Sequence, residues 1–285
     1  MHNLLLAIFF SSCIIVTFRL FSILRIDNLQ AITANYFIAA LLSFLTWQGD
    51  FNFYEIPGRS WFHLSAINGV FFILVFFVFA RSAQKAGIAI TAVASKMSVI
   101  IPVGIGFLIY GDFISFLKIA GILIAFPAFY LIFKKQDKPI EPDKKYILLP
   151  LILFLGTGTN DSVMKHAQKF YIGDEYLLFL GVVFTFSLFI GMGFLIHKMI
   201  KTRQNIKLRN IIAGFLLGFF NFASTYFFLK GLAVFESSVF FPIFNVSIVS
   251  MGALIGLVIF KEKLWWKNWV GIILAITTIL FIAIA

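Results

Sequence analysis

The sequence has little charge and almost no cysteine, and each shortage excludes a class of protein. Charged residues make up 12% of the 285 positions, whereas hydrophobic residues make up 61%. A soluble domain carries about 25% charged residues. A chain this apolar cannot cover its surface with polar groups, so lipid must be its solvent. The single cysteine, Cys13, excludes an internal disulfide, and the four histidines offer no metal-ligand spacing. We therefore expect a membrane protein without a metal or cofactor.

Motifs for ATP hydrolysis and for catalysis are also missing. The sequence has no G-x-x-x-x-G-K-[ST] loop, which argues against an ATP-driven pump. It has no H-E-x-x-H motif or carboxylate cluster, and His63, His166 and His197 are scattered near the ends of apolar runs. A channel would need a polar pore stripe or a charged ring, and isolated polar positions do not make one. We expect no enzyme, and a channel or scramblase is the weaker alternative to a carrier.

Long apolar runs are what the sequence does have. A bilayer core about 30 Å thick needs about 20 apolar residues per spanning helix. The runs between charged or Gly/Pro/Asn breaks predict an all-α polytopic fold with ten transmembrane helices, at approximately 3–24, 30–48, 62–80, 87–110, 115–133, 146–168, 176–197, 210–229, 237–260 and 268–285. The first run lacks a preceding basic segment, so we expect a span rather than a cleaved signal peptide.

The basic residues gather in the short loops between these spans. The net charge is +11, with sixteen cations in loops after odd-numbered spans and four after even-numbered spans. This distribution indicates contact with anionic lipid and no nucleic-acid partner. Because short basic loops tend to remain cytoplasmic, the charge bias alone places both termini outside the cytoplasm.

The two halves of the chain repeat each other. A shift of 150 residues brings together the pairs Gly121 with Gly271, Gly106 with Gly256, and Asp112 with Glu262. Five spans per half make the second copy enter the membrane from the opposite side, which predicts a 5+5 inverted repeat typical of secondary transporters. We expect a first repeat at 1–133, a charged linker at 134–145 and a second repeat at 146–285. A complete repeat in one chain also predicts a monomer.

The layout resembles the EamA-like transporters of the drug/metabolite transporter superfamily. The resemblance is carried by residues 99–131, with Gly111-Asp112 and then Gly121, and by residues 249–281, with Lys261-Glu262 and then Gly271. It implies a multi-pass protein of the bacterial inner membrane that exports amino acids or related metabolites, with proton or exchange coupling. The first copy has Asp where the family usually has Glu. Family members usually have cytoplasmic termini, opposite to the charge bias, so sidedness stays open.

Lys96 is the most informative charge within a span. An intramembrane charge costs about 2.5–3.5 kcal/mol, so each one requires an explanation. Lys96 lies ten residues into the fourth run, beside Ser95 and before Pro102, which frees a backbone carbonyl and lets the helix bend. We interpret Lys96 as a cation in a central cavity that attracts an anionic or zwitterionic substrate. A lysine held by a buried partner for structural reasons is the alternative.

Three further charges lie inside spans. Arg19 and Lys165 coincide when the first and sixth spans are aligned, which would place one cation toward each mouth of a shared cavity; snorkelling to the interface is the alternative. Asp161 is the only acidic residue well inside a span and lies four positions before Lys165, where an ion pair can form. Asp161 is thus the candidate for proton coupling, or else a structural partner of Lys165.

A second group of candidates consists of uncharged polar residues within the spans. Each has a side chain able to hydrogen-bond either a substrate or a neighbouring helix. These candidates are Asn68, Ser95, Asn160, Asn221, Thr225, Tyr226 and Asn245.

Together these observations favour a secondary active transporter of a small polar metabolite, such as an amino acid or another solute bearing a carboxylate or phosphate, working by alternating access. Three intramembrane cations against one acid favour an anionic group on the substrate. Efflux of drugs or lipid-like solutes is the alternative.

Overall fold

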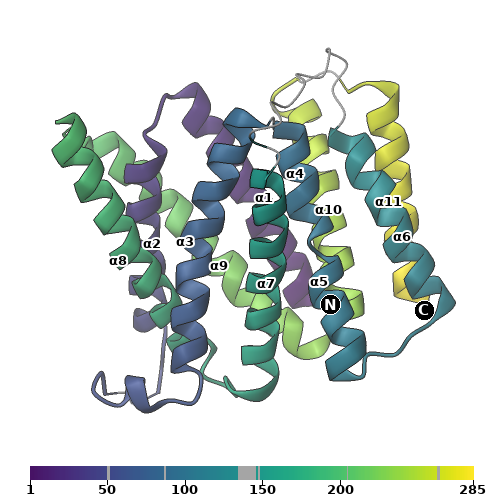
Figure 1. The fold of residues 1–285 in the computed structure, drawn as a ribbon, viewed down its shortest axis with the longest axis horizontal. Coiled ribbons are helices and arrows are strands. Elements are labelled where there is room, and N and C mark those ends of the chain that lie inside the picture. The colour runs from purple at the N-terminus through teal and green to yellow at the C-terminus, as the bar shows by residue number, and fades with distance from the viewer. Residues whose placement is uncertain (50–51, 87, 134–145, 147, 204, 262–263) are drawn as a thin grey trace. The chain divides into compact units, whose positions relative to one another are not determined.

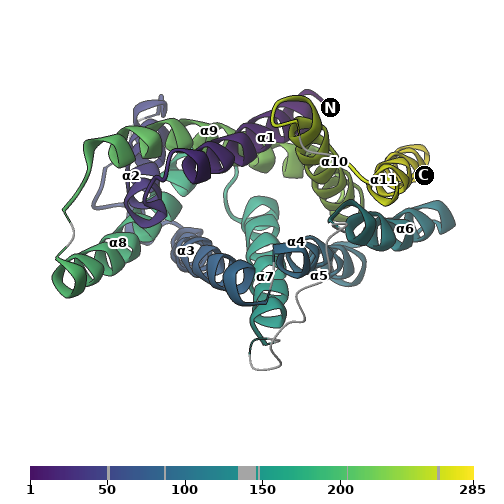
Figure 2. The ribbon, with the colours of Figure 1, turned by 90° about the horizontal axis from the view of Figure 1, so that it is seen from above.

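The computed structural model describes residues 1–49, 52–86, 88–133, 146, 148–203, 205–261 and 264–285. Within these residues every regular element is a helix, as predicted (Figure 1, Figure 2). The elements are α1 (His2–Ile23), α2 (Asn28–Leu45), η1 (Ile56–Gly58), α3 (Phe62–Lys85), α4 (Ile88–Met97), α5 (Ile100–Ile105), η2 (Gly106–Tyr110), α6 (Phe116–Phe133), α7 (Leu148–Phe170), α8 (Tyr176–Thr202), α9 (Leu208–Val234), α10 (Ser237–Val258) and α11 (Trp266–Ile284).

Each of the ten predicted spans contains helix. In the described part of the chain, nine helices are long and apolar enough to cross a membrane. The sixth predicted span forms α7, which is long enough but carries Asn160, Asp161 and Lys165 among its polar residues. The fourth predicted span is divided into α4, α5 and the π-helical turn η2. The predicted linker 134–145 lies outside the described residues.

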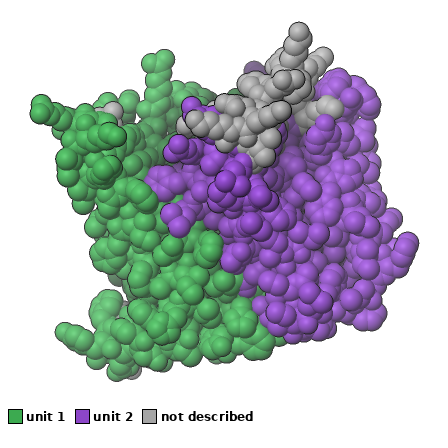
Figure 3. Space-filling view, in the orientation of Figure 1, with its two compact units in different colours: residues 1–73, 163–233 green, residues 74–162, 234–285 purple. Residues whose placement is uncertain are grey.

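The helices form two compact units (Figure 3). Unit 1 comprises Met1–Ile73 and Val163–Ala233, and unit 2 comprises Leu74–Ser162 and Val234–Ala285. Each unit takes helices from both halves of the chain, with α3 and α7 divided between them. The two compact units therefore do not coincide with the predicted repeats at 1–133 and 146–285. The repeats stay a prediction.

In unit 2, α6 and α11 pack closely and reciprocally. A Cβ added at Gly121 would lie 2.7 Å from Ile282 Cγ1, and one added at Gly271 would lie 2.7 Å from Ile132 N. Ile132 and Ile282 are themselves 150 residues apart. Both glycines are therefore needed for a close helix approach. The reciprocity is what the predicted repeat requires of this helix pair.

Loops that the predicted topology places on one side of the membrane meet within each unit. In unit 1, Trp61 Nε1 donates a 2.6 Å hydrogen bond to Glu175 Oε2. Trp61 follows the second predicted span, and Glu175 follows the sixth. Likewise Asp27 after the first span accepts a 2.6 Å bond from Lys198 near the end of the seventh. In unit 2, Asp112 Oδ2 after the fourth span accepts from Ser238 N after the eighth at 2.9 Å. These contacts require helices that alternate in direction.

Candidate functional site

The fourth span is broken immediately after Lys96. Helix α4 ends at Met97, α5 begins at Ile100, and the two residues between form a turn. Pro102 has no N–H to offer the Ser98 carbonyl, which instead accepts from Ile101 N at 3.0 Å. The predicted free carbonyl is therefore taken up by the shorter bond from Ile101, and the helix is interrupted four residues before the proline. A broken helix of this kind gives polar backbone and side-chain groups a place within a membrane fold.

Lys96 reaches from the end of α4 to α10. Its Nζ donates a 3.0 Å hydrogen bond to Asn245 Oδ1, and Asn245 Nδ2 donates to the Phe241 carbonyl at 3.1 Å. Asn245 is buried, whereas Lys96 and Ser95 are half-buried. The Ser95 carbonyl accepts a 2.6 Å bond from Ser98 Oγ. The hydrogen-bond partner of Lys96 is thus a neutral amide.

Helix α7 brings an acidic residue, Asp161, to Lys96. The charges of Asp161 and Lys96 interact, and the Asp161 carboxyl is hydrogen-bonded to the side chain of Asn160. Among the described residues, Asn160 Oδ1 and Thr157 Oγ1 are shielded from solvent and lack a hydrogen-bond partner. A shielded polar atom without a partner costs about 1–3 kcal/mol. These two atoms can bond to a solute or water that enters beside Asp161.

Gly158 allows α7 to approach the break. A Cβ at this position would lie 2.4 Å from Ile101 Cδ1, 2.8 Å from Ile101 Cβ and 2.9 Å from the Ser98 carbonyl oxygen. Any larger residue would push α7 away from α5. Asp161 lies one turn further along α7, so this contact sets its position relative to Lys96.

Unit 2 thus gathers five of the predicted site residues. They are Lys96, Ser95, Asn160, Asp161 and Asn245, contributed by α4, α7 and α10. We call these five residues the Lys96 cluster. The remaining six predicted residues lie in unit 1, at Arg19, Asn68, Lys165, Asn221, Thr225 and Tyr226.

The two cations of unit 1 have different surroundings. Arg19 on α1 is exposed, whereas Lys165 on α7 is buried and donates to the Leu232 carbonyl and, at 3.4 Å, to Gln168 Oε1. A helix carbonyl and a side-chain amide are therefore among the partners of the Lys165 ammonium group. The predicted ion pair between Asp161 and Lys165 falls across the division between the units and stays a prediction.

The uncharged candidates of unit 1 lie mainly on α9. Asn221 and Thr225 share a face, as predicted, because Thr225 Oγ1 donates to the Asn221 carbonyl at 2.8 Å. The Tyr226 ring lies 4.7 Å from Lys230 Nζ in a cation–π contact. On α3, Asn68 is fully buried, and neither of its amide atoms has a hydrogen-bond partner within the described residues. Both amide atoms of Asn68 therefore retain the capacity to form hydrogen bonds.

One buried cation was not predicted. Lys118, in the first turn of α6, forms an ion pair with Glu236 and donates to the Phe113 carbonyl at 2.9 Å. Burial raises the pKa of Glu236, but the hydrogen bond and charge of Lys118, with bonds from Phe113 and Ser238, outweigh burial and hold it below its ordinary value of 4.5. Lys118 was counted as a loop cation because it begins an apolar run. Gly158 was also missed, because a sequence does not reveal which glycine faces another helix.

Residues 144–284 match the model of the EamA-like transporter family. This half of the chain belongs to the EamA-like transporter family. That family is part of the drug/metabolite transporter superfamily, so the predicted resemblance is confirmed for the C-terminal half. EamA-like proteins are transporters rather than enzymes, and the chain is a multi-pass membrane protein.

Two further similarities extend over nearly the whole chain. An uncharacterized protein of Haemophilus influenzae is 26% identical over 288 residues, covering 98% of this chain and 96% of that protein. A crystal structure of a protein that is 12% identical superposes with a TM-score of 0.80, covering 98% of this chain and 94% of the other. At this identity the second similarity shows the fold alone.

Proposed function

We propose that this chain is a secondary active transporter that moves a small polar metabolite by alternating access across the bacterial inner membrane. The observation that carries the proposal is the Lys96 cluster at the break of the fourth span. A half-buried lysine that is bonded to a neutral amide beside one carboxylate is costly inside a membrane. Such a residue therefore suggests a function.

The chemistry of the cluster favours an amino acid or a related solute bearing a carboxylate or phosphate. The ammonium group of Lys96 attracts the anionic group of the solute, and a bound carboxylate can take the place of Asn245 Oδ1 as its acceptor. The carboxylate of Asp161 attracts an amino group. The partnerless atoms Asn160 Oδ1 and Thr157 Oγ1 supply further hydrogen bonds. Export is the direction that the family implies.

Alternating access is supported by the construction of the chain. The predicted inverted repeat would let two halves exchange conformations, and that exchange would open the site first to one side and then to the other. The reciprocal packing of Gly121 and Gly271 supports such a symmetry for α6 and α11. The turn that interrupts the helix between α4 and α5 supplies a point at which it can bend.

A ligand screen followed by counterflow tests the proposal. The purified protein is first screened by thermal shift against amino acids, organic acids and phosphorylated metabolites, since a ligand at 100 times its Kd adds about 2.7 kcal/mol of stability. Each hit is then assayed in proteoliposomes preloaded with unlabelled solute. A carrier gives saturable, transient accumulation of the labelled solute. Flux that does not saturate and shows no counterflow would indicate a channel and contradict the proposal.

A further inference from the structure

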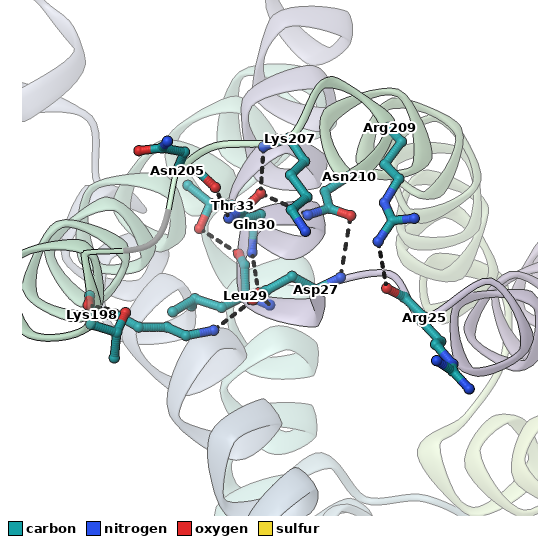
Figure 4. A network of polar contacts seen from close by, with 11 residues as sticks. Arg25, Asp27, Leu29, Gln30, Thr33, Lys198, Asn205, Lys207, Arg209 and Asn210 are labelled. Atoms are coloured by element: carbon teal, nitrogen blue, oxygen red, sulfur yellow. Dashed lines mark hydrogen bonds and ion pairs between the residues drawn. The ribbon is translucent and has the colours of Figure 1, made fainter.

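Unit 1 contains a second polar region, distinct from the Lys96 cluster. A cavity of about 390 Å³ lies between the loop joining α1 to α2 and the loop joining α8 to α9. Figure 4 shows the polar contacts around it. Its lining includes three cations, Arg25, Lys207 and Arg209, and a single carboxylate, Asp27. We call this the basic loop cavity.

The carboxylate of the cavity is already satisfied. Asp27 Oδ1 accepts from Leu29 N at 3.0 Å and from Gln30 N at 3.2 Å, which caps α2, and Oδ2 accepts from Lys198 at 2.6 Å. Burial raises the pKa of Asp27, but these bonds and the Lys198 charge outweigh burial and hold it below its ordinary value. Asp27 is therefore ionised and pairs with Lys198. The three lining cations are not needed to neutralise it.

The loops are held together without using the charged ends of Arg25 or Lys207. Buried Gln30 accepts from Lys207 N at 3.0 Å and from Asn210 Nδ2 at 2.7 Å. The Arg25 carbonyl accepts from Arg209 Nη2 at 3.4 Å. Arg25 and Lys207 thus contribute only backbone atoms, and within the described residues no carboxylate forms a salt bridge with either side chain. Both charged groups are available to a ligand.

The position of the cavity adds to its attraction for anions. It lies at the N-terminal ends of α2 and α9, where the helix dipoles contribute positive potential. Apolar residues next to its cations are exposed, among them Leu24, Ile206 and Leu208 at 59%, 52% and 73%. Cations beside exposed apolar side chains at the end of a span are placed where phospholipid headgroups lie.

We propose that the basic loop cavity binds a phosphate group, with an anionic phospholipid as the occupant that its surroundings favour. The guanidinium of Arg25 and the ammonium of Lys207 would form charge-assisted hydrogen bonds to the phosphate oxygens. A soluble phosphate ester has the same chemistry and is the second source. This site does not depend on the transport function, because none of its residues belongs to the Lys96 cluster.

The test compares two double variants of the full chain in mild detergent. Arg25→Gln/Lys207→Gln removes the two available cations and keeps the backbone contacts of both residues. Lys201→Gln/Arg203→Gln removes the same charge from exposed residues at the end of α8 that do not line the cavity. Each protein is titrated with dioleoylphosphatidylglycerol, with dioleoylphosphatidylcholine and with sn-glycerol 3-phosphate, and the shift in Tm gives an apparent Kd.

We expect phosphatidylglycerol to raise the Tm of the parent protein more strongly than phosphatidylcholine. Its apparent Kd should be weakened roughly tenfold or more in Arg25→Gln/Lys207→Gln and unchanged in the control variant. A response to glycerol phosphate with the same variant pattern would assign the site to a soluble phosphate. No preference for either phosphate compound, or equal losses in both variants, would overturn the proposal. If the double variant does not fold, Lys207→Gln alone carries the same comparison.

Discussion

At the scale of single residues, the placement of Lys96 defines the site. Its ammonium group is bonded to Asn245, and its charge interacts with Asp161. A direct salt bridge would neutralise the positive charge with a group of the protein itself. In the proposed function, a substrate anion would replace the neutral Asn245 amide as the hydrogen-bond acceptor of Lys96.

Asp161 is the single residue that we propose as the proton carrier, because proton coupling requires a group that titrates. We expect Asp161→Asn to abolish the pH dependence of transport while the protein still folds, since an amide keeps the size of the side chain but binds no proton. The measurement is counterflow and proton-driven uptake between pH 5.5 and 8.5. Asp174→Asn, in an exposed loop of unit 1, is the control and should behave like the parent. An unchanged pH profile in Asp161→Asn would remove Asp161 as the proton carrier.

At the scale of secondary-structure elements, the contact between α7 and the α4–α5 break positions the cluster. We expect Gly158→Ala to reduce the free energy of unfolding by about 1–3 kcal/mol, because the added Cβ clashes with Ile101 and the Ser98 carbonyl. Substrate affinity should fall with it, since α7 carries Asp161. Thermal unfolding and ligand titration measure the two effects.

A matched control for that substitution lies in α8. A Cβ at Gly193 would meet nothing within 4 Å, so Gly193→Ala should be neutral or raise stability slightly through helix propensity. Equal behaviour of the two alanine variants would contradict the close approach at Gly158.

The helices show which features of the fold can be predicted from the sequence. Every predicted span contains helix because apolar length and charged breaks suffice to place one. The break after Lys96 was predicted in kind, because Pro102 removes a specific hydrogen bond. Five of the eleven site candidates gather around that break. The partners of Lys96 and Lys165 could not be predicted, because neighbouring helices are chosen by packing over distances that local pattern does not encode.

At the scale of the whole molecule, two ion pairs near helix ends link stability to pH. The pKa of Asp27 and that of Glu236 lie below their ordinary values of 3.8 and 4.5. A lowered pKa in the folded state stabilises the protein above the ordinary value and is lost as the pH falls through the folded one. We therefore expect the Tm to be constant near neutral pH and to decline below about pH 4.5, the ordinary value for Glu236.

Glu236→Gln separates one of these contributions. The amide cannot titrate, so the decline in Tm at acid pH should be shallower than in the parent. The neutral-pH Tm should itself be lower, because buried Lys118 loses its counter-charge. Tm measured from pH 7 to pH 3 for both proteins tests this, and parallel curves would show that Glu236 does not contribute to the acid limb.

Counterflow by Lys96→Ala tests the proposed role of this lysine in substrate binding. Parent and variant are reconstituted in equal amounts into proteoliposomes, with Lys201→Ala as a control that removes an exposed lysine from the end of α8. The probe is the radiolabelled solute that stabilises the parent protein most strongly. We expect Lys96→Ala to insert normally but to give no counterflow above empty vesicles, and Lys201→Ala to match the parent. Parental counterflow in Lys96→Ala would contradict the claim that the cation at the helix break binds the substrate.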